Sequence, residues 1–232
     1  MDWQPIILTF NLAMITTVIL FFLSIPISYW LAHTQSKIKP IIEALVSLPL
    51  VLPPTVLGFY LLIAFSPSSG FGHWFEANIG LRLVFSFEGL VIASVIYSLP
   101  FMVQPIHSGL SNLPKYLQES AFILGKSKSQ TLLKVLLPNI KTSLLTGIVL
   151  AFAHTIGEFG VVLMIGGNIP GKTKVASIAI YDEVESLNYP AANGYALFLV
   201  VTTFLVLLLV YSINGGYFKR RIIHVTKSGR PS

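Results

Sequence analysis

The sequence contains no cysteine and few charged residues, and each shortage narrows the class of protein. Without cysteine, the chain can form neither disulfide bonds nor thiolate metal sites. Only 10% of its residues are charged, whereas soluble domains carry roughly 25%. Hydrophobic residues make up 54% of the chain, and the mean hydropathy is +0.77. We therefore expect a polytopic membrane protein that forms one domain, residues 1–232, without a linker.

The sequence also lacks the short motifs that mark common catalytic sites. It has no His-Glu-x-x-His and no Gly-x-Ser-x-Gly. We therefore predict no catalytic residue, no cofactor bound by this chain and no ATPase within it. His33, His73 and His224 are scattered and predict no metal site. The distribution of the net charge of +6 indicates membrane topology and not a nucleic-acid partner.

Five apolar stretches are long enough to cross a lipid bilayer, which takes about 20 residues. They cover approximately Ile6–Ala32, Ile41–Phe65, Gly89–Ile106, Ile140–Ile165 and Ala196–Ile213. This pattern predicts an all-α membrane protein with five transmembrane helices. The residues before the first stretch lack the basic region of a signal peptide, and the stretch is too long for one, so we expect it to be retained.

The basic residues favour one orientation of these helices in the membrane, because cytoplasmic loops carry an excess of Lys and Arg. With the N-terminus outside, the cytoplasmic face receives Lys37, Lys39, Lys141, the polar stretch Leu113–Pro138 and the tail with Lys219, Arg220, Arg221, Lys227 and Arg230. The outer face receives only Arg82, Lys172 and Lys174. We therefore predict a cytoplasmic C-terminus. The outer loops are Ser66–Glu88 and Gly166–Asn193, and the second is expected to contain an interfacial helix.

The polar stretch Leu113–Pro138 has the pattern of two short helices joined at a glycine. Leu113, Leu117, Ala121 and Leu124 are spaced as on one face of a helix. Gly125 is placed to end that helix, because glycine takes the left-handed cap conformation without strain. Ser127 or Ser129 can cap a second helix, Gln130–Leu137, and Pro138 closes the unit. On this evidence the stretch is either an amphipathic loop on the membrane surface or a docking element.

The spacing in this stretch resembles the EAA loop of ABC-importer permeases. The matching residues are Glu119-Ser120-Ala121, Gly125 and Val135-Leu136-Leu137-Pro138, with Ser120 in place of the first Ala and Val135 in place of Ile. In that family the loop is a coupling helix that docks in a groove of the ATP-hydrolysing subunit. The resemblance thus implies that Glu119, Ser120, Ala121, Gly125, Leu137 and Pro138 couple the chain to an ATPase.

The fourth apolar stretch contains two ionisable residues, His154 and Glu158. Ionisable residues within a span are costly and by default mark a pathway or a buried pair. Because the two are four residues apart, we expect them to share one face of a helix. Two interpretations stay open: a structural pair that satisfies itself, or a face that lines the translocation path or its gate. Gly157 and Gly160 would permit a close approach of helices there.

Prolines interrupt the second apolar stretch at Pro49, Pro53 and Pro54. A proline removes a backbone donor and clashes with the preceding turn. The break is either a kink with consequences for packing alone or a pore-lining element, in which free carbonyl groups and the Thr55 hydroxyl face water. Under the second interpretation Pro53, Pro54 and Thr55 belong to the pathway.

Three blocks together resemble the permease subunits of molybdate ABC transporters. They are PLVLPPTVLGFYLL (Pro49–Leu62), the stretch around Glu119 and Gly125, and IGEFGVVLMIGGNIPGKTKVASIAIYDEVE (Ile156–Glu185). Members of that family often carry Arg at the position of His154. Sulfate and tungstate permeases share much of the pattern and are the alternatives. An intramembrane enzyme or an assembly factor is a remote alternative.

The resemblance implies a MetI-like permease fold in the bacterial cytoplasmic (inner) membrane. The partners that it implies are a second copy of the chain around a central path, cytoplasmic ABC ATPase subunits that bind ATP and Mg, and an extracytoplasmic molybdate-binding protein. In this scheme, selectivity belongs to the binding protein, so the permease needs little affinity for its cargo.

Overall fold

The computed structural model describes residues 2–214, and the regular structure within that range is helical. In chain order the helices are α1 (Gln4–His33), α2 (Lys39–Val51), α3 (Pro54–Phe65), α4 (Gly70–Ile79), α5 (Phe87–Ser111), α6 (Lys115–Ile123), α7 (Lys128–Thr131), the π-helix η1 (Leu132–Leu136), α8 (Leu137–Asn139), α9 (Lys141–Ile156), α10 (Gly160–Gly166), α11 (Ala176–Glu185) and α12 (Tyr189–Asn214). The predicted basic tail, Lys219 to Arg230, and His224 lie outside the described residues.

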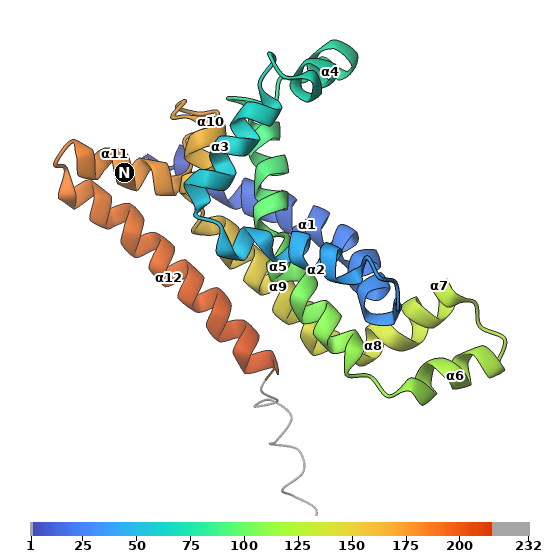
Figure 1. The fold of residues 1–232 in the computed structure, drawn as a ribbon. Coiled ribbons are helices and arrows are strands. Elements are labelled where there is room, and N and C mark those ends of the chain that lie inside the picture. Colours follow the sequence, from blue (N-terminus) through green and yellow to red (C-terminus); the bar gives the residue numbers. More distant parts are fainter. Residues whose placement is uncertain (1, 215–232) are drawn as a thin grey trace, which may run out of the picture.

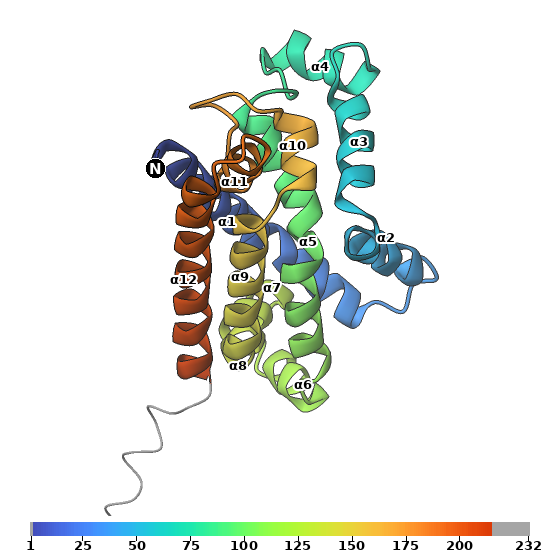
Figure 2. The same cartoon turned by 90° about the vertical axis from the view of Figure 1, so that its left-hand side faces the viewer.

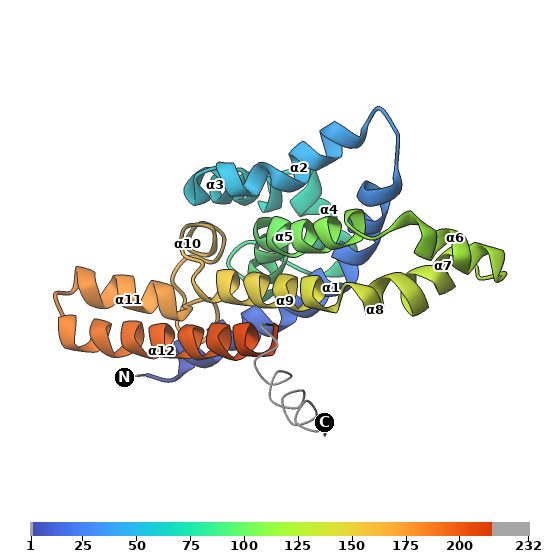
Figure 3. The ribbon, with the colours of Figure 1, turned by 90° about the horizontal axis from the view of Figure 1, so that it is seen from below.

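The centre of the molecule is formed by α1, α5 and α9, which pack against one another. Their contacts bury large apolar side chains, among them Leu12 and Leu20 of α1 and Met102 and Ile106 of α5. Figure 3 shows the pair α2 and α3 on one side of α5, and α11 with α12 on the opposite side beyond α9. Apolar burial of this kind and the apolar faces of the outer helices agree with a membrane subunit.

The short helices gather at two opposite ends of the long ones. One end holds the N-terminus, α4, α10 and α11, and the other holds α6, α7 and α8 (Figures 1 and 2). At the second end, the last residues of α1 and α5 meet α6 around a small pocket that is lined by His33, Ser111 and Glu119. The stretch Leu113–Pro138 therefore lies at the opposite end of the molecule from the predicted outer loops.

Three of the predicted spans are single long apolar helices: α1, α5 and α12. Two further pairs of helices have the length and composition of a span but are bent at a short break. The described part of the chain therefore has three helices that are long and apolar enough to cross a membrane, or up to five candidates if each bent pair counts as one. One pair is α2 and α3, which meet at 114°. The other is the run Lys128–Asn139 with α9, which meet at 81°.

The bend between α2 and α3 follows from its two consecutive prolines. A residue before proline is driven out of the helical region. Accordingly Leu52 has φ −70° and ψ 135°, and Pro53, itself before Pro54, has φ −53° and ψ 135°. Pro49, in contrast, lies within α2. The predicted interruption of the second stretch is therefore located at Leu52–Pro53.

The fourth predicted span is not one helix, and the prediction that His154 and Glu158 share a helix face is wrong. Helix α9 ends at Ile156, and α10 begins only at Gly160. Contacts with α11 stabilise the non-helical link between them. The Ser177 hydroxyl of α11 donates to the Glu158 carbonyl at 2.6 Å, and Phe159 packs on Tyr181. The apolar pattern continues through the link, so hydropathy alone does not reveal it.

Candidate transport site and coupling loop

The first helix of the coupling loop, residues 113–138, ends at the glycine that the sequence predicts. Gly125 has φ +75°, its N–H donates to the Phe122 carbonyl at 2.9 Å, and the Lys126 N–H donates to the Ala121 carbonyl at 3.0 Å. This pair of bonds is a Schellman motif, which satisfies the last carbonyl groups of a helix. Ala121 is the residue of α6 that is buried. The predicted role of Gly125 as a helix stop is confirmed.

The N-cap of the second helix of the loop is Ser127, one of the two predicted caps. The Ser127 hydroxyl accepts from the Gln130 N–H at 3.3 Å, and the Gln130 side chain accepts from the Ser127 N–H at 3.2 Å. This reciprocal capping box starts the helix at Lys128, two residues before the predicted Gln130.

The end of this second helix also differs from the prediction, because Pro138 lies inside it. The helical run continues to Asn139. A proline there removes one backbone donor and crowds the preceding turn. The chain adapts by widening that turn into the π-helix Leu132–Leu136, and the Asn139 side chain donates to the Val135 carbonyl at 2.7 Å.

The outer surface of the coupling loop is exposed and partly apolar. Glu119 and Ser120 are exposed, and Glu119 makes no ion pair within the described residues. At the turn, Ile123 is 85% exposed and Leu124 is 77% exposed. Large apolar side chains that are this exposed at a loop tip are typical of a docking surface.

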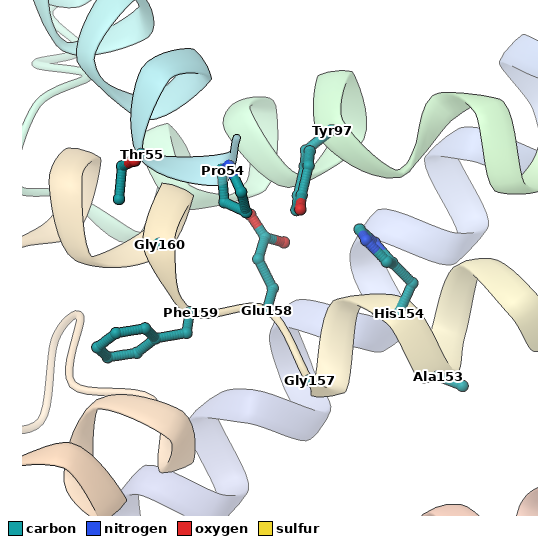
Figure 4. A pocket seen from close by; sticks show the side chains of 9 residues that line it. All are labelled: Pro54, Thr55, Tyr97, Ala153, His154, Gly157, Glu158, Phe159 and Gly160. Atoms are coloured by element: carbon teal, nitrogen blue, oxygen red, sulfur yellow. The ribbon is translucent and has the colours of Figure 1, made fainter. Parts of the chain in front are cut away.

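At the opposite side of the bundle, a pocket of about 430 Å³ lies where the two helix breaks meet (Figure 4). It is lined by Pro54, Thr55, Tyr97, Ala153, His154, Gly157, Glu158, Phe159 and Gly160. The structure thus brings together six of the seven predicted gate or pathway residues. Pro53 is not among the lining residues, although it forms the adjoining N-cap of α3.

Glu158 is the most unusual residue of this pocket. Its side chain extends from the link toward Pro54, in the same space that Tyr97 and His154 face (Figure 4). It is 3% exposed, and neither carboxyl oxygen has a hydrogen bond within the described residues. The Ser94 hydroxyl of α5 lies close enough to interact with it, but the two do not meet the geometry of a hydrogen bond. Unpaired buried carboxyl groups are rare in native structures, and each requires a physical explanation.

A chain of hydrogen bonds fixes the imidazole of His154. The Thr155 hydroxyl donates to the Ala151 carbonyl at 2.9 Å, so its oxygen must accept from the Ser98 hydroxyl at 3.1 Å. The single Ser98 hydrogen is then used, and its oxygen must accept from His154 Nδ1 at 2.9 Å. The ring is stacked on Phe101 with centroids 3.9 Å apart. Nε2 is left as the free nitrogen of His154.

The two glycines of the link differ in what surrounds them. A Cβ added to Gly160 would lie 2.8 Å from Pro54 Cβ and 3.3 Å from the Thr55 nitrogen, so α10 can approach α3 only through a glycine. A Cβ on Gly157 would meet nothing closer than 3.8 Å. Gly58 of α3 repeats the tight contact, at 2.9 Å from Met164 Cβ of α10. The predicted close approach therefore holds for Gly160 and not for Gly157.

Sequence reasoning missed the contribution of α5 to the pocket. Tyr97, Ser94 and Ser98 come from the third span, to which the sequence-based predictions assign no site residue. The available signal was the i, i+4 spacing of the two serines beside a tyrosine in an otherwise apolar helix.

The fold is shared with the permease subunits of solved ABC transporters. A structure titled as a bacterial ABC transporter involved in the import of the acidic polysaccharide alginate matches with a TM-score of 0.75 over 95% of this chain and 79% of that one, at 18% identity. An inward-facing structure of the MetNI methionine ABC transporter matches with a TM-score of 0.70 over 92% of this chain and 94% of that one, at 16% identity.

Sequence comparison narrows the class to a family. A model of the binding-protein-dependent transport system inner membrane component matches residues 24–224, and the chain belongs to that family. It is 47% identical to the molybdenum transport system permease protein ModB of Azotobacter vinelandii over 91% of this chain and 93% of that one. It is 33% identical to the putative molybdenum transport permease YvgM of Bacillus subtilis (90% and 92%) and 34% identical to the sulfate permease CysT of Escherichia coli (80% and 66%).

Proposed function

We propose that this chain is the permease subunit of an ATP-driven importer whose cargo is the oxyanion molybdate. The observation that carries the proposal is the 47% identity to a molybdenum transport permease over nearly the full length of both chains. The three sequence blocks around Pro53, Gly125 and Glu158 support it. The sulfate permease is more distant and longer than this chain, and it supports sulfate as the second candidate.

We further propose that two copies of the chain enclose the path and that the coupling loop of each docks an ATPase subunit. The docked face would consist of the exposed polar residues Glu119 and Ser120, the apolar tip at Ile123 and Leu124, and Gly125, where the helix ends. Leu137 and Pro138 would fix the return of the chain to the bundle. ATP and Mg would be bound by the ATPase, and this chain would hold no cofactor and catalyse no reaction.

The proposed orientation places the coupling loop in the cytoplasm of a bacterium and the N-terminus, α4 and α11 outside. It rests on the excess of basic residues at the coupling-loop end. An extracytoplasmic binding protein would deliver molybdate to the outer end. The whole chain would act as a single domain, in which movement of the docked loops changes the side of the membrane to which the path opens.

Uptake of radiolabelled molybdate by liposomes tests the proposal. The liposomes would contain this chain with the ATPase and the binding protein from the neighbouring genes, and sulfate and tungstate would be added as competitors. ATP-dependent uptake that tungstate blocks and sulfate does not supports a molybdate and tungstate importer. Uptake that sulfate blocks would assign the chain to sulfate transport. No uptake of any oxyanion by an assembled, active complex would contradict the proposed cargo class.

A further inference from the structure

The Glu158 carboxyl group lies in the pocket wall, and no cation from residues 2–214 is paired with it to balance a negative charge. Of the pocket-lining residues, the other titratable ones are Tyr97 of α5 and His154 of α9, and α3 and α10 contribute none. Helix α11 reaches the link through Ser177 and through the neutral phenol Tyr181, which packs on Phe159. The ion pairs within the described residues, Lys39–Glu43 and Lys174–Asp182, involve neither Glu158 nor its neighbours. A buried carboxylate without a counter-charge or hydrogen bonds is strongly disfavoured.

We propose that Glu158 is held as a neutral carboxylic acid, and that the pocket is a transit site in which uncharged hydrogen-bond donors contact the oxyanion. The inference rests on the proposed function, because it names the contacts of that same cargo. A carboxylate only accepts hydrogen bonds and would repel an anion, whereas the neutral acid carries one O–H donor. The neutral form therefore allows Glu158 to contact an anion, whereas the carboxylate would repel it.

The pocket offers further donors that the protein itself does not use. The side-chain hydroxyl groups of Thr55 and Tyr97 make no hydrogen bond to any described residue, and both residues line the pocket. The hydrogen-bond chain through Ser98 leaves Nε2 of His154 free, but this nitrogen donates only when the ring is a cation, so the neutral ring adds no donor to the pocket. Together with the Glu158 acid, the hydroxyl groups of Thr55 and Tyr97 form a set of uncharged donors that can contact the oxygens of a tetrahedral oxyanion.

The same donor set explains how a cargo could leave the site again. Neither Lys nor Arg lines the pocket, so no permanent cation would hold a dianion there. The carboxyl oxygens are fully covered in this conformation, so the contact with cargo requires the joint between α3 and α10 to open. Under alternating access, the Glu158 O–H would be exposed to cargo in the open state and buried in the closed state.

Two substitutions of Glu158 separate a donor from a scaffold. Glu158→Gln keeps an N–H donor and the size of the side chain, and Glu158→Leu keeps the size alone. We expect molybdate uptake within about threefold of wild type for Gln and a loss of about tenfold or more for Leu, as one hydrogen bond to a charged group is removed. Glu43→Gln, at a half-exposed surface position, is the matched control and should leave uptake unchanged.

The pH dependence of molybdate uptake is a second measurement, and it would not change if Glu158 had a purely structural role. Raising the pH removes the Glu158 proton and replaces a donor by an anion, so wild-type uptake should fall at alkaline pH. Glu158→Gln cannot lose that proton, and any fall that it still shows reports His154, Tyr97 or a partner subunit. A wild-type profile that falls more steeply than that of Glu158→Gln therefore supports the inference, and parallel profiles overturn it.

The outcomes distinguish this inference from the proposed function. Absence of uptake by wild type contradicts the proposed function before any variant is compared. With active wild type, equal uptake by Glu158→Leu, or an equal loss in both variants, overturns the neutral-donor site and leaves the importer intact. Complex yield and basal ATPase activity show whether Glu158→Leu assembles; where it does not, the two pH profiles decide.

Discussion

The coupling loop and the Glu158 pocket lie at opposite ends of α9, and they are built in contrasting ways. The loop is exposed and is shaped by contacts between near neighbours in sequence, such as Gly125 with Phe122 and Ser127 with Gln130. The pocket contains the buried Glu158 side chain and joins segments about 40 to 100 residues apart, from Pro54 through Tyr97 to Glu158. Local rules therefore predict the first region, whereas the second depends on how distant helices pack.

The largest expected effect comes from filling the closest helix contact of the pocket. Gly160→Ala places a Cβ 2.8 Å from Pro54 Cβ, so α10 and α3 must separate. Overpacking of this kind costs about 1 to 3 kcal/mol. We expect a lower thermal stability of the purified protein in detergent, together with impaired uptake.

Gly157→Ala is the control within the same link, because its Cβ would have an ordinary distance of 3.8 Å to the nearest atom. Its melting temperature should stay near that of wild type. If both variants lose the same stability, the proposed importance of the α3–α10 contact is wrong.

The next effect concerns the glycine of the coupling loop, where the constraint is in the backbone alone. Gly125 has φ +75°, and a Cβ there would meet no atom within 4 Å. Gly125→Ala should therefore cost about 1 to 2 kcal/mol through conformational strain. We expect weaker binding of the ATPase subunit and lower stimulation of ATP hydrolysis by loaded binding protein.

Two further variants check that strain, and not the loss of flexibility, is the cause. Gly125→Asn should restore part of the activity, because Asn tolerates the left-handed conformation. Gly70→Ala, at the exposed start of α4, also meets no atom within 4 Å and should be neutral for stability. Wild-type ATPase docking by Gly125→Ala would contradict the assigned role of the loop.

A smaller effect is expected at the capping box of the second loop helix. Ser127→Ala removes the acceptor for the Gln130 N–H and should cost about 1 kcal/mol of local helix stability. Ser129→Ala changes the same side chain in the first turn of the helix without touching the cap. Hydrogen exchange of the Gln130 amide should increase in the first variant only, and an equal increase in both would show that the cap contributes nothing.

The smallest effect tests a link between the two outer segments. Asp182 of α11 accepts from the Asn168 side chain at 2.7 and 2.8 Å and pairs with Lys174, so it ties the loop after α10 to α11. The pair is about one quarter exposed, so solvent screens it and Asp182→Asn should cost at most about 1 kcal/mol. The loss should shrink at high salt in a double-mutant cycle with Lys174→Met, and an undiminished coupling energy would argue against an ionic contribution.

The contrast also explains how far the sequence predicts the structure. Apolar length predicts α1, α5 and α12, proline geometry predicts the break at Pro53, and glycine and serine caps predict the turn of the coupling loop. The break at Gly157–Phe159 is not predictable in this way, because it is held by Ser177 and Tyr181 from α11. The same holds for Ser94, Ser98 and Tyr97, whose relation to Glu158 exists only after α5 and α9 pack.

Helix α9 gives the two regions a direct mechanical connection. Its 16 residues form a rod of about 24 Å that begins next to α8 and ends at Ile156, next to Gly157 of the pocket. A rod that is displaced at one end moves at the other at the same time and by a similar amount. ATPase docking would therefore need no series of side-chain rearrangements to reach the Glu158 carboxyl group. A displacement of the loop would move the pocket end of α9 directly, as one rigid body.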